Sequence, residues 1–176
     1  MTKSDKAVEI YRKALELEVQ GRKFYLKAGA KARDQPGQKL FAMLADDELV
    51  HFQRIEKIFN SLKKGEKFSL DVKTMPQKHP EIREIFAQLA LANKDKIKPQ
   101  ASDLDAVEVG LDLENRSINL YAGAVPLASG QLEKEFLEQM VKEETFHHTA
   151  LSDLKFFLTN PQSWYIEHEK HTLEGV

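Results

Sequence analysis

Two copies of the pattern Glu-x-x-His are the residues most able to do chemistry in this sequence. They are Glu48 with His51 and Glu144 with His147. Residues three apart on an α-helix lie on the same face, so one pair can offer a carboxylate and an imidazole to the same metal ion. These oxygen and nitrogen ligands suit iron, manganese or zinc. The chain has no cysteine, which excludes a cysteine-ligated zinc site, a cysteine-held iron–sulfur cluster and a thiol nucleophile.

Each pair follows a further glutamate by thirty residues, Glu18 in the first case and Glu114 in the second. All six polar residues interrupt apolar stripes at helical spacing. Four carboxylates in a core would repel one another and lose their hydration. Two divalent cations would balance four carboxylates beside two neutral imidazoles, so the charges favour a dinuclear site. The predicted terminal carboxylates are Glu18 and Glu114. The predicted bridging carboxylates are Glu48 and Glu144. The predicted imidazole ligands are His51 and His147.

The elements that must position these ligands are predicted to be helices. Stretches rich in Ala, Leu, Glu and Lys, with few glycines and prolines, predict an all-α protein. A turn at Asp34-Gln35-Pro36-Gly37 is expected to precede a second helix from about residue 38. Residues 1–160 are predicted to form one four-helix bundle and residues 161–176 an extension that packs on the bundle or on a partner subunit. The predicted hairpins span about residues 5–62 and 102–159. The long crossover between them spans about residues 63–101.

The two hairpins repeat each other without a gap at an offset of 96 residues. The matching residues include all six predicted ligands as well as Tyr25 and Tyr121. A repeated hairpin that cannot bury its apolar face alone predicts two halves related by an approximate two-fold axis. Each tyrosine lies seven residues after a predicted ligand, where a phenol can hydrogen-bond a ligating carboxylate. The alternative for both tyrosines is an ordinary place in the apolar core.

Three polar residues adjoin the predicted ligands in sequence: Asp47, Glu143 and His148. Adjacent helical residues point about 100° apart. We therefore leave these three out of the ligand set and expect them at the surface or behind the ligands.

The composition excludes other classes of partner. The formal net charge is −2, too balanced to indicate binding to nucleic acid or to anionic lipid. No apolar run has the length of a membrane span or the character of a secretory signal. We expect a cytoplasmic protein that is not bound to a membrane.

These motifs resemble those of the rubrerythrin family within the ferritin-like superfamily, and the resemblance spans nearly the whole chain. It implies a ferritin-like bundle with a non-heme di-iron centre that, once reduced, passes electrons to hydrogen peroxide or dioxygen. Peroxide detoxification is the usual role in that family. The motifs that carry the resemblance are Glu18 with Gly-Arg-Lys-Phe-Tyr at 21–25, Leu-Ala-Asp-Asp-Glu-Leu-Val-His at 44–51, Glu114 with Tyr121, Glu-Glu-Thr-Phe-His at 143–147 and Asn-Pro-Gln-Ser-Trp-Tyr at 160–165.

The chain departs from the family pattern in two respects. It has no cysteine for a rubredoxin domain, so we expect an external rubredoxin-like or flavoprotein donor of electrons. Typical members have an additional glutamate where this chain has Ser117. The remaining symmetric ligand set is similar to the ferroxidase centre of bacterioferritin or a manganese catalase-like site.

The sequence therefore leaves several functions open. A di-iron peroxidase is the first, a ferroxidase or oxidase that uses dioxygen is the second, and metal storage or sensing without turnover is the third. A purely structural bundle would bind no metal at all. Two iron ions are the expected cofactor, with manganese or zinc as substitutes. We also expect a homodimer, and the long crossover would allow exchange of hairpins between subunits.

Overall fold

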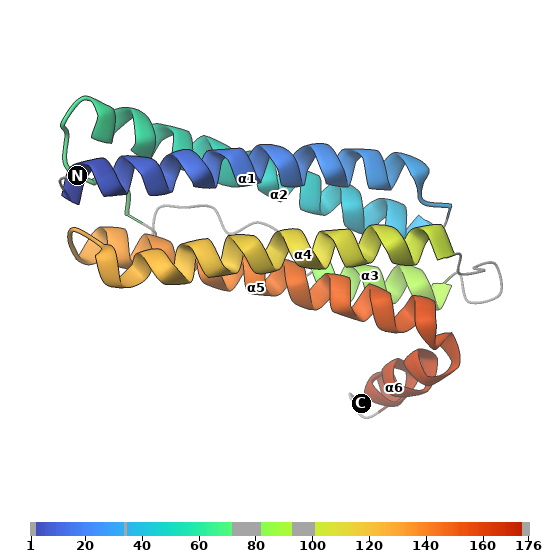
Figure 1. Cartoon of the computed structure of the whole chain (residues 1–176). Helices are drawn as coiled ribbons and strands as arrows, with labels where there is room; N and C mark the ends of the chain where they lie inside the picture. Colours follow the sequence, from blue (N-terminus) through green and yellow to red (C-terminus); the bar gives the residue numbers. More distant parts are fainter. Residues whose placement is uncertain (1–2, 34, 72–81, 93–100, 174–176) are drawn as a thin grey trace.

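The computed structural model of the chain describes residues 3–33, 35–71, 82–92 and 101–173. Within these residues the protein forms six α-helices, one short 3-10 turn and no β-strand. None of the described helices combines the length and the apolar content needed to cross a membrane. The elements shown in Figure 1 are α1 (Lys3–Lys31), α2 (Gln35–Lys63), α3 (Ile82–Ala92), α4 (Ala101–Ala124), η2 (Val125–Leu127), α5 (Gln131–Thr159) and α6 (Pro161–Leu173).

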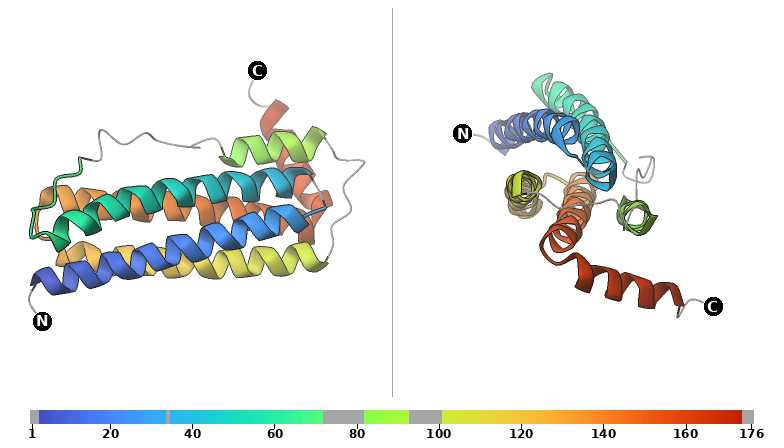
Figure 2. Two further views of the ribbon diagram at one scale, coloured as in Figure 1. Left: turned by 90° about the horizontal axis from the view of Figure 1, so that it is seen from above. Right: turned by 90° about the vertical axis from the view of Figure 1, so that its right-hand side faces the viewer.

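The four long helices form the predicted bundle. Helix α1 packs along α2, and α4 packs along α5, so each hairpin of the repeat is a pair of neighbouring helices. The two pairs lie against each other through α1 and α4 and through α2 and α5. Figure 2 shows these helices running side by side along the length of the molecule. The all-α four-helix architecture expected from the sequence is confirmed.

Helix α2 begins at Gln35, three residues before the position predicted from the Pro-Gly pair. Proline fixes φ near its helical value and lacks an N–H group that the first helical turn would leave unpaired in any case. Pro36 therefore starts the helix and does not belong to a preceding turn. Gln38 then donates a hydrogen bond from Nε2 to the carbonyl oxygen of Ala32 at 2.7 Å, which joins the start of α2 to the end of α1.

The apolar core consists of two clusters. One contains residues such as Tyr25, Leu44 and Leu151, and the other contains residues such as Ile55 and Met140. On each long helix, the predicted metal ligands lie between the residues of the first cluster and those of the second. Apolar side chains therefore seal the polar layer from both ends of the bundle.

Helices α3 and α6 pack at one end of the bundle. The Trp164 ring makes edge-to-face contacts with Phe86 of α3 and Phe157 of α5, and its Nε1 donates to Asp153 Oδ1 at 3.2 Å. Tyr165 donates to the carbonyl oxygen of Ala90 at 3.3 Å. The beginning of the C-terminal extension thus packs on the bundle of its own chain. Parts of the predicted crossover, residues 72–81 and 93–100, lie outside the described residues.

The packing of Trp164 gives a prediction about stability. Trp164→Ala should lower the free energy of unfolding by about 3–5 kcal/mol, because it removes a large, fully buried ring and leaves a cavity. Urea denaturation followed by circular dichroism measures the change. The exposed neighbour Ile166 is the control, and Ile166→Ala should change the free energy by less than about 0.5 kcal/mol. Equal losses in the two variants would contradict this account of α6.

Candidate metal centre

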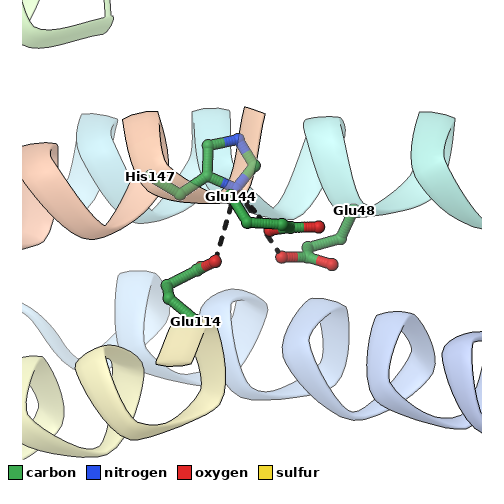
Figure 3. Close-up of side chains that lie close together, drawn as sticks. All are labelled: Glu48, Glu114, Glu144 and His147. Atoms are coloured by element: carbon green, nitrogen blue, oxygen red, sulfur yellow. Dashed lines mark ion pairs between the residues drawn. The ribbon is translucent and has the colours of Figure 1, made fainter. Parts of the chain in front are cut away.

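The structure brings all six predicted ligands together at one level of the bundle. Glu18 comes from α1 and Glu114 from α4, while α2 and α5 each supply a Glu-x-x-His pair. All six residues are at most 4% exposed. They form two overlapping groups in which the possible ligand atoms lie within 4.8 Å of one another. The first group is Glu48, Glu114, Glu144 and His147, shown in Figure 3, and the second is Glu18, His51 and Glu144.

The carboxylate of Glu144 lies between the two histidines. Its Oε1 lies 3.2 Å from Nδ1 of His51, and its Oε2 lies 3.4 Å from Nδ1 of His147. It is also the residue that the two groups share. Glu48, predicted as the other bridge, belongs to the His147 group alone, with Oε1 3.9 Å from His147 Nδ1. The two carboxylates predicted as equivalent bridges are therefore placed differently.

The two predicted tyrosines each hold a carboxylate of the other hairpin. Tyr25 on α1 donates a hydrogen bond to Oε1 of Glu114, and Tyr121 on α4 donates to Oε1 of Glu18. Burial and the charge of the carboxylate that it contacts raise the pKa of each phenol well above its ordinary value, so both phenols stay protonated. Each tyrosine thereby occupies one oxygen of its carboxylate and leaves Oε2 to face the cluster.

The buried atoms that face one another have no hydrogen-bond partner. Leaving such an atom unpaired costs about 1–3 kcal/mol. A divalent cation accepts electron pairs from carboxylate oxygen and from neutral imidazole nitrogen, and it would satisfy these atoms together. The donor set therefore fits a metal centre. The atoms are Oε2 of Glu18 and of Glu114, both carboxylate oxygens of Glu144, and Nδ1 of His51 and of His147.

Burial and mutual repulsion in the cluster favour the uptake of protons by several of its side chains. Burial, followed by the charges of Glu18 and Glu144, raises the pKa of Glu48 well above its usual value. Burial also raises the pKa of Glu114, and although His147 opposes this the pKa reaches about 7. For both histidines burial lowers the pKa, but the surrounding carboxylates outweigh it and hold the pKa well above the ordinary value. Protons and cations therefore compete for the same atoms.

Two residues excluded from the ligand set lie directly behind the histidines. Nε2 of His51 lies 2.8 Å from Glu143 Oε2, and Nε2 of His147 lies 3.4 Å from Asp47 Oδ2. Each carboxylate contacts the histidine of the facing helix, which its sequence position alone did not predict. The positions carry a signal all the same, because each carboxylate directly precedes the glutamate of a Glu-x-x-His pair. His148 is the third excluded residue, and Ser152 Oγ donates to its backbone carbonyl at 2.8 Å.

Gly21 on α1, the first residue of the Gly-Arg-Lys-Phe-Tyr motif, has a role in the site that the sequence did not predict. A Cβ atom at this position would lie 3.0 Å from Cδ of Glu48 and 3.2 Å from each of its carboxylate oxygens. The absence of a side chain therefore lets Glu48 pack directly against α1. The signal in the sequence was its spacing, because Gly21 lies three residues after Glu18 on the same helical face.

The central place of Glu144 predicts an unequal effect of two substitutions on metal content. Glu144→Gln should reduce bound metal from two ions per chain to less than one, because both groups use this carboxylate. Glu18→Gln should leave about one ion, because Glu18 belongs to one group. Elemental analysis of protein loaded with excess metal and desalted measures the content, and Glu138→Gln on the exposed face of α5 is the control. Equal losses in the first two variants would count against a bridging Glu144.

The packing of Glu48 against Gly21 predicts an effect of adding one methyl group. Gly21→Ala should displace the Glu48 carboxylate and weaken metal binding by about tenfold, the size of effect expected when support of a ligand is lost. Gly123→Ala on α4 is the matched control, because a Cβ there would meet no atom within 4 Å. This control should keep full metal affinity and gain about 0.5–1 kcal/mol of stability. Calorimetric titration with Mn²⁺ compares them, and unchanged binding in Gly21→Ala would contradict the prediction.

One comparison with known proteins finds a match. A family model described as Rubrerythrin matches residues 9–155, a span that contains all six predicted ligands and both tyrosines. Separate comparisons with curated proteins and with solved structures find no match. The family match covers well over half of the chain, so the chain belongs to the rubrerythrin family.

Proposed function

We propose that the protein holds two iron ions among these six side chains and reduces hydrogen peroxide to water with electrons from an external donor. The observation that carries the proposal is the buried ring of carboxylate oxygens and imidazole nitrogens without hydrogen-bond partners. Membership of the rubrerythrin family supports iron as the metal, because its members are di-iron proteins. Oxygen and imidazole ligands also accept manganese or zinc, so the ligand set by itself does not select iron.

Two iron ions, when bound, can supply one electron each to the O–O bond of peroxide. The protein contributes the geometry around them. Tyr25 and Tyr121 hold one oxygen of Glu114 and of Glu18, which leaves the second oxygen of each carboxylate to bind metal. The protonated phenols keep these hydrogen bonds because burial raises their pKa. The carboxylate of Glu144 lies between the two histidines and would join the two metal positions.

The depth of the site supports a small oxidant. The six ligands are at most 4% exposed, and apolar clusters close the bundle on both sides. A molecule of two oxygen atoms can enter such a layer with little rearrangement, whereas an organic substrate would have to separate the helices. Hydrogen peroxide and dioxygen are therefore the oxidants to compare.

The source of electrons is proposed to be a separate protein. The 176 residues contain no cysteine, so they hold no rubredoxin-type iron site of their own. A rubredoxin-like protein or a flavoprotein would supply electrons one or two at a time. The homodimer and the cytoplasmic location expected from the sequence stay predictions.

One observation favours a second candidate function, oxidation of Fe(II) by dioxygen. Ser117 is a buried residue three positions after Glu114, where typical rubrerythrins have an additional glutamate. The remaining set of four glutamates and two histidines is the one that resembles a ferroxidase centre. Iron storage without turnover is the third outcome that the following experiment distinguishes.

Rapid mixing of the anaerobic, iron-loaded protein tests the proposal. The absorbance of the protein monitors oxidation of its diferrous form. This oxidation should be at least tenfold faster with hydrogen peroxide than with dioxygen. An excess of reductant should then sustain peroxide consumption, and Glu144→Gln should abolish it while Glu138→Gln should not. The reverse order of rates would favour the ferroxidase or oxidase. Iron loading without sustained consumption of either oxidant would favour storage.

A further inference from the structure

The C-terminal half of α1 and the residues that follow it carry an unbalanced positive charge. Residues 19–33 contain five lysine and arginine residues and no aspartate or glutamate. Four of the five side chains are exposed, and the fifth, that of Arg22, is partly buried. We call these five residues the basic surface: Arg22, Lys23, Lys27, Lys31 and Arg33.

Three lysines of the basic surface form a row along the outside of the helix. Lys23, Lys27 and Lys31 are spaced by four residues, so they lie on one face of α1. With a rise of 1.5 Å per residue, the row is about 12 Å long. Helix α1 packs against α2 and α4, and no other described helix lies in front of this half of α1 in the view of Figure 1. The row is therefore open to a partner.

The charges of the basic surface are not paired inside the chain. Within the described residues, none of the five cations forms an ion pair. The N-terminal half of the same helix differs, because Arg12 pairs there with Glu9 and Glu16. Nε of Arg22 is buried and has no hydrogen-bond partner in the structure. The positive charge is therefore available to carboxylates from outside.

The fold does not require these charges. Lysines four residues apart repel each other and destabilise a helix. A cation stabilises the helix dipole only in the last turn, and of the row of lysines only Lys31 lies there. Helix stability therefore does not explain Lys23 and Lys27. The second hairpin has the same architecture without them, because displacement by 96 residues takes the basic surface to Ile118, Asn119, Gly123, Leu127 and Ser129.

The same stretch of α1 touches the cluster of predicted ligands from its inner face. Gly21 packs against the carboxylate of Glu48, and Tyr25 donates a hydrogen bond to Glu114. The partly buried ring of Phe24 lies edge-to-face on that of Tyr25, with 5.5 Å between the ring centroids. A helix with its side chains is about 10–12 Å across. The basic surface therefore lies roughly one helix diameter from the cluster, and Tyr25 links the helix to it directly.

An exposed apolar side chain within the basic surface indicates that the partner is a protein. Leu26 is 49% exposed. It lies four residues after Arg22 and three after Lys23, so the three side chains are neighbours on the helix. An apolar contact with charged residues around it is typical of a protein–protein interface. The formal net charge of −2 for the whole chain argues against a nucleic acid as the partner.

We propose that the basic surface of α1 docks a small, acidic electron-donor protein, whose carboxylates pair with the five cations. The inference rests on the proposed function and deepens it, because it names the place where electrons enter and the charge of the donor. Each docking event delivers one electron from the reduced donor. Two such electrons, with two protons from solvent, balance the reduction of one hydrogen peroxide to two water molecules.

A binding experiment tests the basic surface without turnover. The probe is a fluorescently labelled rubredoxin of net negative charge, and its anisotropy gives the Kd for the full-length protein at low ionic strength. The triple variant Lys23→Glu, Lys27→Glu, Lys31→Glu should raise the Kd by about 10–100-fold, because it replaces attraction by repulsion. Raising the salt concentration should weaken binding to the wild-type protein and reduce this difference.

The matched control changes the net charge of the protein by the same amount at exposed lysines outside α1. It should raise the Kd by less than about threefold, because the charges lie away from the basic surface. Circular dichroism confirms that each variant is folded. Replacement of the row of lysines by glutamine removes the attraction without adding repulsion, and its Kd should fall between those of the wild type and the glutamate variant. The control is Lys57→Glu with Lys64→Glu and Lys142→Glu.

The kinetics of the iron-loaded protein separate docking from chemistry. With reduced rubredoxin as the donor, the glutamate variant of the row should raise the KM for rubredoxin by about 10–100-fold and leave kcat within about twofold. Dithionite is a small reductant that needs no docking surface. Peroxide consumption driven by dithionite should therefore stay within about threefold of the wild type in every variant.

The outcomes separate the docking surface from the proposed function. Equal Kd values for the glutamate variant and its control, or a wild-type protein that binds neither rubredoxin nor an acidic flavodoxin, would overturn the docking surface alone. Tighter binding of double-stranded DNA than of rubredoxin, lost in the glutamate variant, would assign the surface to nucleic acid and also overturn it. Rubredoxin binding that depends on the basic surface, in an iron-loaded protein that consumes no peroxide, would support the docking surface and contradict the proposed function.

Discussion

The structure depends on one electrostatic requirement, the neutralisation of four carboxylates and two imidazoles inside an apolar bundle. Burial raises the pKa of Glu48 and Glu114, and the histidines take up protons in response to the carboxylates around them. Without protons or cations, the desolvation and mutual repulsion of these groups would work against the packing of the helices. The apolar clusters on either side shield the layer from solvent and so strengthen this requirement.

Hydrogen bonds from the two tyrosines cross between the halves of the repeat. Tyr25 of the first hairpin holds Glu114 of the second, and Tyr121 of the second holds Glu18 of the first. The outer carboxylates cross in the same way, from α2 to the histidine of α5 and from α5 to the histidine of α2. Neither hairpin can therefore build half of the centre alone. The complete site is present only where the two hairpins pack together.

The approximate two-fold symmetry is broken close to the ligands. Gly21 brings Glu48 against α1, whereas its repeat position is Ser117. Arg54 and Gln139 donate hydrogen bonds to Glu143, and their repeat positions hold the apolar residues Ala150 and Met43. The surroundings of the six side chains are therefore not identical on the two sides of the cluster.

The sequence by itself determined the four long helices, the repeat and the six polar residues of the core, because helical periodicity and chain spacing are local properties. It did not predict that the C-terminal extension forms helix α6. It placed the start of α2 three residues late, since a Pro-Gly pair is compatible with both a turn and a first helical turn. Only the tertiary structure decided that Tyr25 holds Glu114, that Glu144 and not Glu48 lies in both groups, and that Arg54 supports Glu143. These contacts join residues on different helices. Which residues meet depends on how the packed helices are rotated and shifted along their axes, and the spacing of residues within one helix does not specify this.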